Sequence, residues 1–178
     1  MNDPRANRGL PLIDRYASGG AILAYAVSGL TDDQTRAHPG PGAWSVAQLV
    51  AHLLDTDLVY ADRMKRVIAE DDPTLQAFDE NRWAARLGYE DESVGESVSL
   101  LAGNRRRLAT VLRTLTAADF ARSGNHTENG KTTLAEVLSY VTNHLDHHLR
   151  FLYAKRANLG VALPPRYGRE ALGTLVTG

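Results

Sequence analysis

Two histidines four residues apart, His144 and His148, interrupt the apolar face of a predicted helix. Around them, apolar residues recur every three or four positions from Leu134 to Leu152, which is the spacing of an amphipathic helix. Residues four apart lie one turn apart on the same helix face. Because neutral imidazole is among the commonest ligands for zinc, nickel, copper and iron, the pair predicts part of a metal site.

A third histidine, His52, lies on the apolar face of another predicted helix. One buried histidine alone would favour a satisfied residue of the core. Three buried imidazoles without partners would each cost about 1–3 kcal/mol, and one bound metal ion would satisfy all three. We therefore predict that His52, His144 and His148 bind a divalent metal. A metal-free histidine cluster is the alternative.

Three histidine ligands without an evident fourth protein ligand are typical of an open metal site. The free position can hold water, a thiolate or a substrate oxygen, so a metal-bound water or thiolate is the predicted nucleophile. Asp55, three residues after His52, and Tyr140, four before His144, are expected to orient a ligand or a bound water.

The other histidines have weaker signals. His147 precedes His148 directly, so it points about 100° away on a helix and is expected to be exposed or to support the site from outside. His38 and His126 lie in predicted loops, where either could approach the mouth of the site.

Four helical patterns must position these residues. They cover residues 10–30, 45–71, 93–115 and 133–157 approximately. Ser45 with Gln48 and Thr133 with Glu136 form capping boxes at two of the helix starts. No strand pattern competes with these helices. The sequence therefore predicts an all-α protein built as an antiparallel four-helix bundle.

Two local features fit this bundle less easily. Gly19 and Gly20 lie inside the first helix and weaken it by about 1 kcal/mol each relative to alanine. The run Arg105-Arg106-Arg107 lies in the third helix, where such charges usually form a solvated face, and it is too short to predict a phosphate-binding stripe.

Composition limits the classes of partner. The 178 residues fit one domain, with a core over about residues 10–159 and a tail over 160–178. Because 20 basic residues balance 21 acidic ones, we expect no nucleic acid and no anionic membrane as partner. The absence of cysteine excludes disulfides and metal ligands from cysteine side chains. No signal peptide or membrane span is evident, so a cytoplasmic protein is expected.

Nearly the whole chain, from about Leu12 to Leu159, resembles the DinB-like (DinB/YfiT-like) superfamily. Three segments carry the resemblance: PGPGAWSVAQLVAHLLDTD at residues 39–57, FDENRWAARLGY at residues 78–89, and HTENGKTTLAEVLSYVTNHLDHHLRFL at residues 126–152. It implies a four-helix bundle with up-down-down-up connectivity. It also implies that His52, His144 and His148 hold zinc or nickel.

The resemblance further implies a homodimer, for which Leu23, Val27, Leu172 and Leu175 are candidate contacts. Some members are thiol-dependent transferases or a maleylpyruvate isomerase, others carry the name of metal-dependent hydrolase, and many have no known activity. Relatives often have glutamine three residues after the last histidine, where this chain has Phe151.

The leading hypothesis is a metal-dependent enzyme, a transferase or a hydrolase, with a small-molecule substrate. By resemblance, a low-molecular-weight thiol is a plausible co-substrate. The alternative is a non-enzymatic ligand-binding or stress-response protein with a structural metal or a metal-free histidine cluster. A fourth protein ligand, or no room beside the histidines, would favour this alternative.

Overall fold

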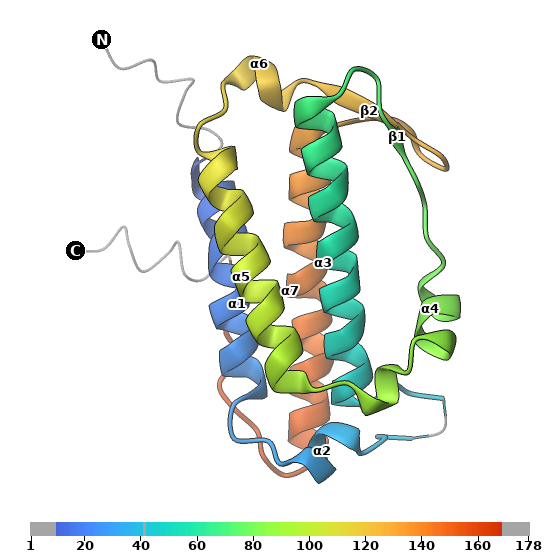
Figure 1. The fold of residues 1–178 in the computed structure, drawn as a ribbon. Helices are drawn as coiled ribbons and strands as arrows, with labels where there is room; N and C mark the ends of the chain where they lie inside the picture. Colours follow the sequence, from blue (N-terminus) through green and yellow to red (C-terminus); the bar gives the residue numbers. More distant parts are fainter. Residues whose placement is uncertain (1–9, 41, 169–178) are drawn as a thin grey trace, which may run out of the picture.

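The computed structural model describes residues 10–40 and 42–168 and contains the four predicted long helices (Figure 1). They are α1 (Leu10–Val27), α3 (Val46–Ala69), α5 (Val94–Leu112) and α7 (Leu134–Asn158). α1 and α3 each pack against both α5 and α7. The segment after α3 runs back along the bundle, so α5 runs in the same direction as α3 (Figure 1). This is the predicted up-down-down-up four-helix bundle.

The predicted capping boxes fix where two site helices begin. The Ser45 hydroxyl accepts from the Gln48 backbone N–H, and the Gln48 side chain accepts from the Ser45 backbone N–H. Thr133 and Glu136 repeat this arrangement before α7. Each box satisfies amide groups that the first helical turn leaves free. The helices end slightly earlier or later than predicted, and the first ends at Val27 rather than near residue 30.

The connections between the helices also include a small sheet, for which the sequence shows no strand pattern. Their elements are α2 (Asp32–Arg36), β1 (Thr74–Leu75), α4 (Glu80–Arg86), η1 (Tyr89–Asp91), α6 (Ala117–Phe120), β2 (Ser123–His126) and β3 (Gly130–Thr133). β2 pairs with β3 as a hairpin and with β1 in parallel. Asn129-Gly130 closes the hairpin, where Gly130 adopts a φ of 72°. Strands of two to four mostly polar residues leave no alternating pattern to detect.

Arg105 is not part of a solvated face, and this corrects the interpretation of the basic run. Its side chain is only 2% exposed, and its Nε donates to the Asp57 carboxylate at 2.6 Å. Arg106 and Arg107 are exposed. A charged partner offsets part of the cost of burying a charge, and Asp57 on α3 supplies one to Arg105 from 48 positions away in sequence.

Gly19 and Gly20 on α1 leave space for the Arg105 side chain and for the backbone of α5. A Cβ atom on Gly19 would lie 2.2 Å from Arg105 Nη1, and one on Gly20 would lie 2.5 Å from the backbone of Ala102 on α5. The glycines that weaken α1 as an isolated helix therefore allow α1 to approach α5 closely.

The residues proposed for a dimer contact divide into two groups. Leu23 is completely buried within the bundle, and Val27 packs against the same core cluster, so Leu23 cannot serve as a dimer contact. Leu172 and Leu175 lie outside the described residues. Of the predicted tail, residues 160–168 are described and contact the bundle, with the Gly168 N–H donating to Asp146 on α7.

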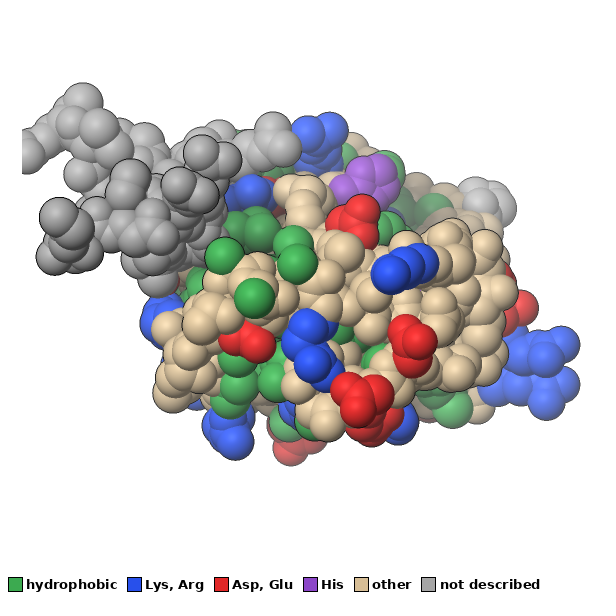
Figure 2. All heavy atoms as spheres, turned by 90° about the horizontal axis from the view of Figure 1, so that it is seen from above, with side chains coloured by type: hydrophobic (Ala, Val, Ile, Leu, Met, Phe, Trp, Pro, Cys, Tyr) green, Lys and Arg blue, Asp and Glu red, His purple; other side chains and the backbone are tan. Residues whose placement is uncertain are grey.

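The surface carries charges of both signs. Viewed from the end that carries α6 and the hairpin, acidic and basic side chains alternate without a continuous basic patch (Figure 2). Across residues 10–40 and 42–168, no helix combines the length and apolar character needed to cross a membrane.

Candidate metal centre

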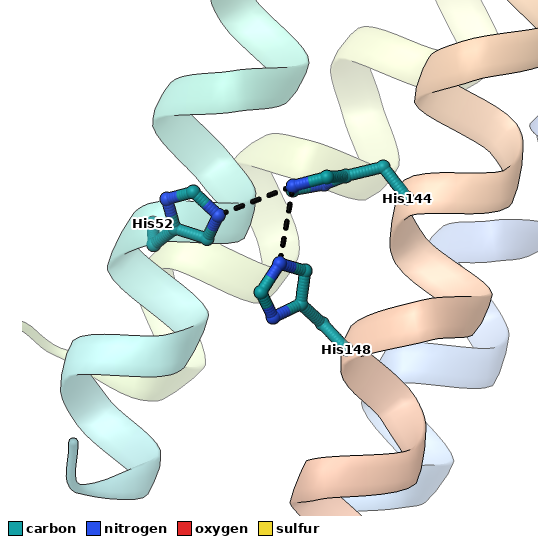
Figure 3. A group of neighbouring side chains, drawn as sticks. All are labelled: His52, His144 and His148. Carbon is teal, nitrogen blue, oxygen red and sulfur yellow. Dashed lines mark hydrogen bonds between the residues drawn. The ribbon is translucent and has the colours of Figure 1, made fainter. Parts of the chain in front are cut away.

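The packing of α3 against α7 brings the three predicted histidines together (Figure 3). His52 comes from α3, and His144 and His148 lie one turn apart on α7. The Nε2 atom of His144 is 3.2 Å from Nε2 of His52 and 3.1 Å from Nε2 of His148. The ligand atoms of all three rings lie within 4.8 Å of one another. Three imidazoles from two helices thus converge on one point.

Hydrogen bonds alone satisfy this cluster poorly. An imidazole nitrogen carries either one proton or one lone pair, so His144 Nε2 cannot form good hydrogen bonds with both neighbours. A cation can use the lone pairs of all three Nε2 atoms. Two nitrogens about 2.0–2.1 Å from a zinc ion with tetrahedral geometry lie roughly 3.3 Å apart, close to the Nε2 separations seen here. The three residues therefore fit a metal ion.

Burial keeps the rings in the neutral form that binds metals. Burial first, and then the neighbouring imidazoles, lowers the pKa of His144 to about 2 and that of His148 to about 4. Burial also lowers the pKa of His52, while the negative charges of Glu80 and Asp55 act in the opposite direction. At neutral pH the cluster holds uncharged imidazoles with free lone pairs.

Of the two residues expected to support the site, Tyr140 contacts His144, and Asp55 forms its hydrogen bond elsewhere. The Asp55 carboxylate accepts a hydrogen bond from the Tyr89 hydroxyl at 2.6 Å and bonds to no histidine. Tyr140 acts through its ring, which stacks on His144 with centroids 5.8 Å apart and on Tyr60 at 4.8 Å. Nδ1 of His52 and Nδ1 of His148 are buried and have no partner among the described residues. The rings are thus held by packing rather than by carboxylates.

Glu80 is the acidic residue that the sequence did not reveal. Its carboxylate lies 3.8 Å from His52 Nε2 and is about half exposed. Glu80 begins α4, which Asp79 caps, and α4 contacts α3, the helix that carries His52. The only available signal was its place in the loose segment between two long helices, which does not predict a contact 28 positions back in the chain.

The remaining three histidines lie outside the cluster and differ in their exposure. His147 is exposed, as predicted, and its ring contacts Phe151 with centroids 5.0 Å apart. His38 is exposed and bonds to the carbonyl of Ala43. His126 is buried at the end of β2 and lines a cavity that also reaches His144.

Two cavities beside His144 leave the site open. One, of about 140 Å³, also includes Glu80 and Thr56 in its walls. The other is a shallow, open groove of about 490 Å³ along α7, and its walls include Tyr140, Asn143 and His147. No fourth metal-binding side chain joins the three histidines within residues 10–40 and 42–168. The arrangement therefore has room for a small molecule next to the histidines.

Sequence comparison identifies similar proteins. One from Oceanobacillus iheyensis is 29% identical over 128 residues, covering 72% of this chain and 74% of the relative. One from Bacillus mycoides is 30% identical over 137 residues, covering 77% of this chain and 79% of the relative. Both bear the name "putative metal-dependent hydrolase".

Structural comparison agrees with this result. YfiT from Bacillus subtilis matches with a TM-score of 0.79 and 26% identity, covering 90% of this chain and 93% of YfiT. YfiT is described as a probable metal-dependent hydrolase with an unusual four-helix bundle topology. The family model of the DinB superfamily matches residues 16–152, which include all three clustered histidines. The chain belongs to the DinB superfamily.

Proposed function

We propose that this protein is a metal-dependent enzyme whose His52, His144 and His148 hold zinc or nickel. The convergence of three Nε2 atoms from neutral rings, one buried and two partly buried, carries this proposal. A divalent ion bound there would act as a Lewis acid on a substrate oxygen or activate a bound nucleophile. Imidazole ligands suit several metals, and the choice of zinc or nickel rests on the family resemblance.

The chain's own residues would bind and orient the substrate. Glu80 contributes a carboxylate at the cavity wall, where it can accept a hydrogen bond from a bound molecule. Tyr140 and Trp44 cover parts of the cluster, with the Trp44 ring centroid 5.2 Å from that of His52. These contacts limit the access of bulk water and leave the cavities as the routes to His144.

Two classes of reaction are proposed for this metal site: hydrolysis and thiol-dependent transfer. The names of the relatives support hydrolysis. A specific observation favours transfer, because it needs room for two molecules beside one metal. Two cavities, of about 140 and 490 Å³, both include His144 in their walls. A low-molecular-weight thiol would occupy one and the acceptor molecule the other.

An activity panel separates these classes. Zinc- and nickel-loaded protein without a histidine tag is assayed for hydrolysis of p-nitrophenyl acetate and for conjugation of cysteine to an electrophile. We expect turnover in one assay that is lost in His144→Ala and kept in His147→Ala, the matched exposed histidine. Turnover of neither class, with metal bound, would favour the non-enzymatic binding protein. Equal turnover in His144→Ala would show that the activity does not come from this site.

A further inference from the structure

We infer that Arg63 and His126 bind an oxyanion group of the substrate, a carboxylate or a phosphate, in the cavity that leads to His144. This inference rests on the proposed function, because it names the substrate class of the same site. Arg63 is a buried cation on α3 that is not part of the histidine cluster.

Arg63 is the least satisfied of three buried arginines. Arg105 pairs with Asp57, and Arg156 donates to three backbone carbonyls, those of Ala26, Ser28 and Val161. Arg63 is 4% exposed, yet it donates one hydrogen bond, from Nη2 to the carbonyl of Gln76 at 2.6 Å. Its Nε is buried without a partner, and no carboxylate among the described residues lies within 4.0 Å of its guanidinium. A buried charge in this state is expensive unless an anion joins it.

The guanidinium of Arg63, which has no carboxylate partner in the described part of the chain, lies in the walls of two cavities. Arg63 lines the cavity of about 140 Å³ that includes His144 and also a neighbouring cavity of about 300 Å³. Both cavities share Tyr60 and Tyr140 as walls. The guanidinium carbon lies 4.5 Å from the centre of the Tyr60 ring, which holds its plane in one orientation. A planar, oriented guanidinium suits the two oxygens of a carboxylate or phosphate.

His126 supplies a second donor in the same cavities. Its Nδ1 accepts hydrogen bonds from the backbone N–H groups of Glu128 and Asn129, each at 3.2 Å. The neutral ring therefore carries its proton on Nε2, as a donor. Burial and the nearby charge of Arg63 lower the pKa of His126, which favours this neutral form. His126 lines both cavities with Arg63, so one guanidinium and one imidazole N–H share a single space.

The acidic residues in these walls do not neutralise the site. The Glu136 carboxylate caps α7 through Thr133. Glu80 lies next to His52, and Glu128 is exposed and forms no ion pair with Arg63. His52 and Arg63 are 11 positions apart on α3, which is about 16 Å along the helix axis before the side chains reach inward. The cavity thus has a cationic end at Arg63 and His126 and a reacting end at His144, so it suits a small molecule that carries its anionic group at one end.

Binding of simple oxyanions tests this inference. Succinate, inorganic phosphate and neutral succinamide are titrated by calorimetry into metal-free protein, so that anions cannot bind a metal ion. We expect succinate or phosphate to bind and succinamide not to bind. Arg63→Gln should weaken this binding at least tenfold, and Arg63→Lys less. Arg107→Gln, which removes the same charge from an exposed position of α5, should leave it unchanged.

The outcomes distinguish this inference from the proposed function. If phosphate binds and succinate does not, the oxyanion of the substrate is a phosphate group. If succinate binds and phosphate does not, it is a carboxylate group. No binding of either anion, or equal binding by Arg63→Gln and wild type, would overturn the inference. Should Arg63→Gln fail to fold, His126→Phe removes the second donor and should weaken binding several-fold. The metal content of Arg63→Gln and His126→Phe, measured on the purified proteins, should stay at the wild-type level. Loss of metal in His144→Ala tests the metal centre, and that result is independent of anion binding.

Discussion

The carboxylate of Glu80 places a negative charge beside the histidine cluster. It lies 3.8 Å from His52 Nε2 and works against the effect of burial on the pKa of that ring. A negative charge at this distance should favour a bound cation, as carboxylates around metal-binding histidines do in general. The Glu80 carboxylate would act on a bound ion through its charge and not as a ligand.

We expect Glu80→Gln to weaken metal binding roughly tenfold while keeping the fold. Competition with a chromogenic chelator measures the affinity. Asp71→Asn is the matched control, because it removes one negative charge from a fully exposed side chain near the end of α3. Equal losses in both variants would mean that net charge, rather than the position of Glu80, sets the affinity.

At the scale of single residues, the sequence predicted which histidines meet but not what surrounds them. The spacing of His144 and His148 on an apolar face is a local property of one helix, and His52 interrupts another such face. Glu80 and Arg63 gave no comparable signal, because an acidic or basic residue on a polar stretch looks like ordinary surface. Their roles depend on contacts between distant segments, which no local pattern encodes.

The approach of α1 to α5 depends on Gly20. A Cβ atom there would lie 2.5 Å from both the Cα and the Cβ of Ala102, and backbone cannot move aside as a flexible side chain can. Gly103, one position along on α5, is also helical, but a Cβ there would lie 4.0 Å from its nearest neighbour, Arg106 Nη2. Alanine substitutions at Gly20 and Gly103 therefore distinguish the effect of close packing from the effect of helix propensity.

We expect Gly20→Ala to lower the free energy of unfolding by about 1–3 kcal/mol through steric overlap. Gly103→Ala should be neutral or should stabilise the protein by up to about 1 kcal/mol, since alanine favours helix. Urea denaturation of the metal-free protein measures both. A stabilising effect of Gly20→Ala would show that α1 and α5 pack less closely than the structure indicates.

At the scale of elements, caps and apolar spacing predicted the long helices, and the errors have physical causes. The glycines in α1 lower its helix propensity, but packing against α5 outweighs that loss. Arg105 looked like surface because its partner, Asp57, comes from another helix. The sheet was missed because β2 and β3 are short and polar, and the Asn129-Gly130 signal marks only the place where the turn meets β3.

For the whole molecule, the homodimer stays a prediction. We expect sedimentation velocity at micromolar concentration to give a dimer, as the family resemblance implies. Leu23 cannot contribute, because it is buried within one chain. Deleting residues 169–178 removes Leu172 and Leu175, and a shift from dimer to monomer would assign the contact to them. A monomer at these concentrations for the full-length chain would contradict the prediction.

The metal content of the protein tests the central proposal most directly. Protein produced without a histidine tag is analysed for zinc, nickel and other transition metals, and compared with His144→Ala and His147→Ala. We expect about one metal ion per chain in the wild type and in His147→Ala, and loss of the ion in His144→Ala. A wild-type protein that contains no metal, and whose thermal stability and spectra do not respond to added zinc or nickel, would contradict the proposed metal site.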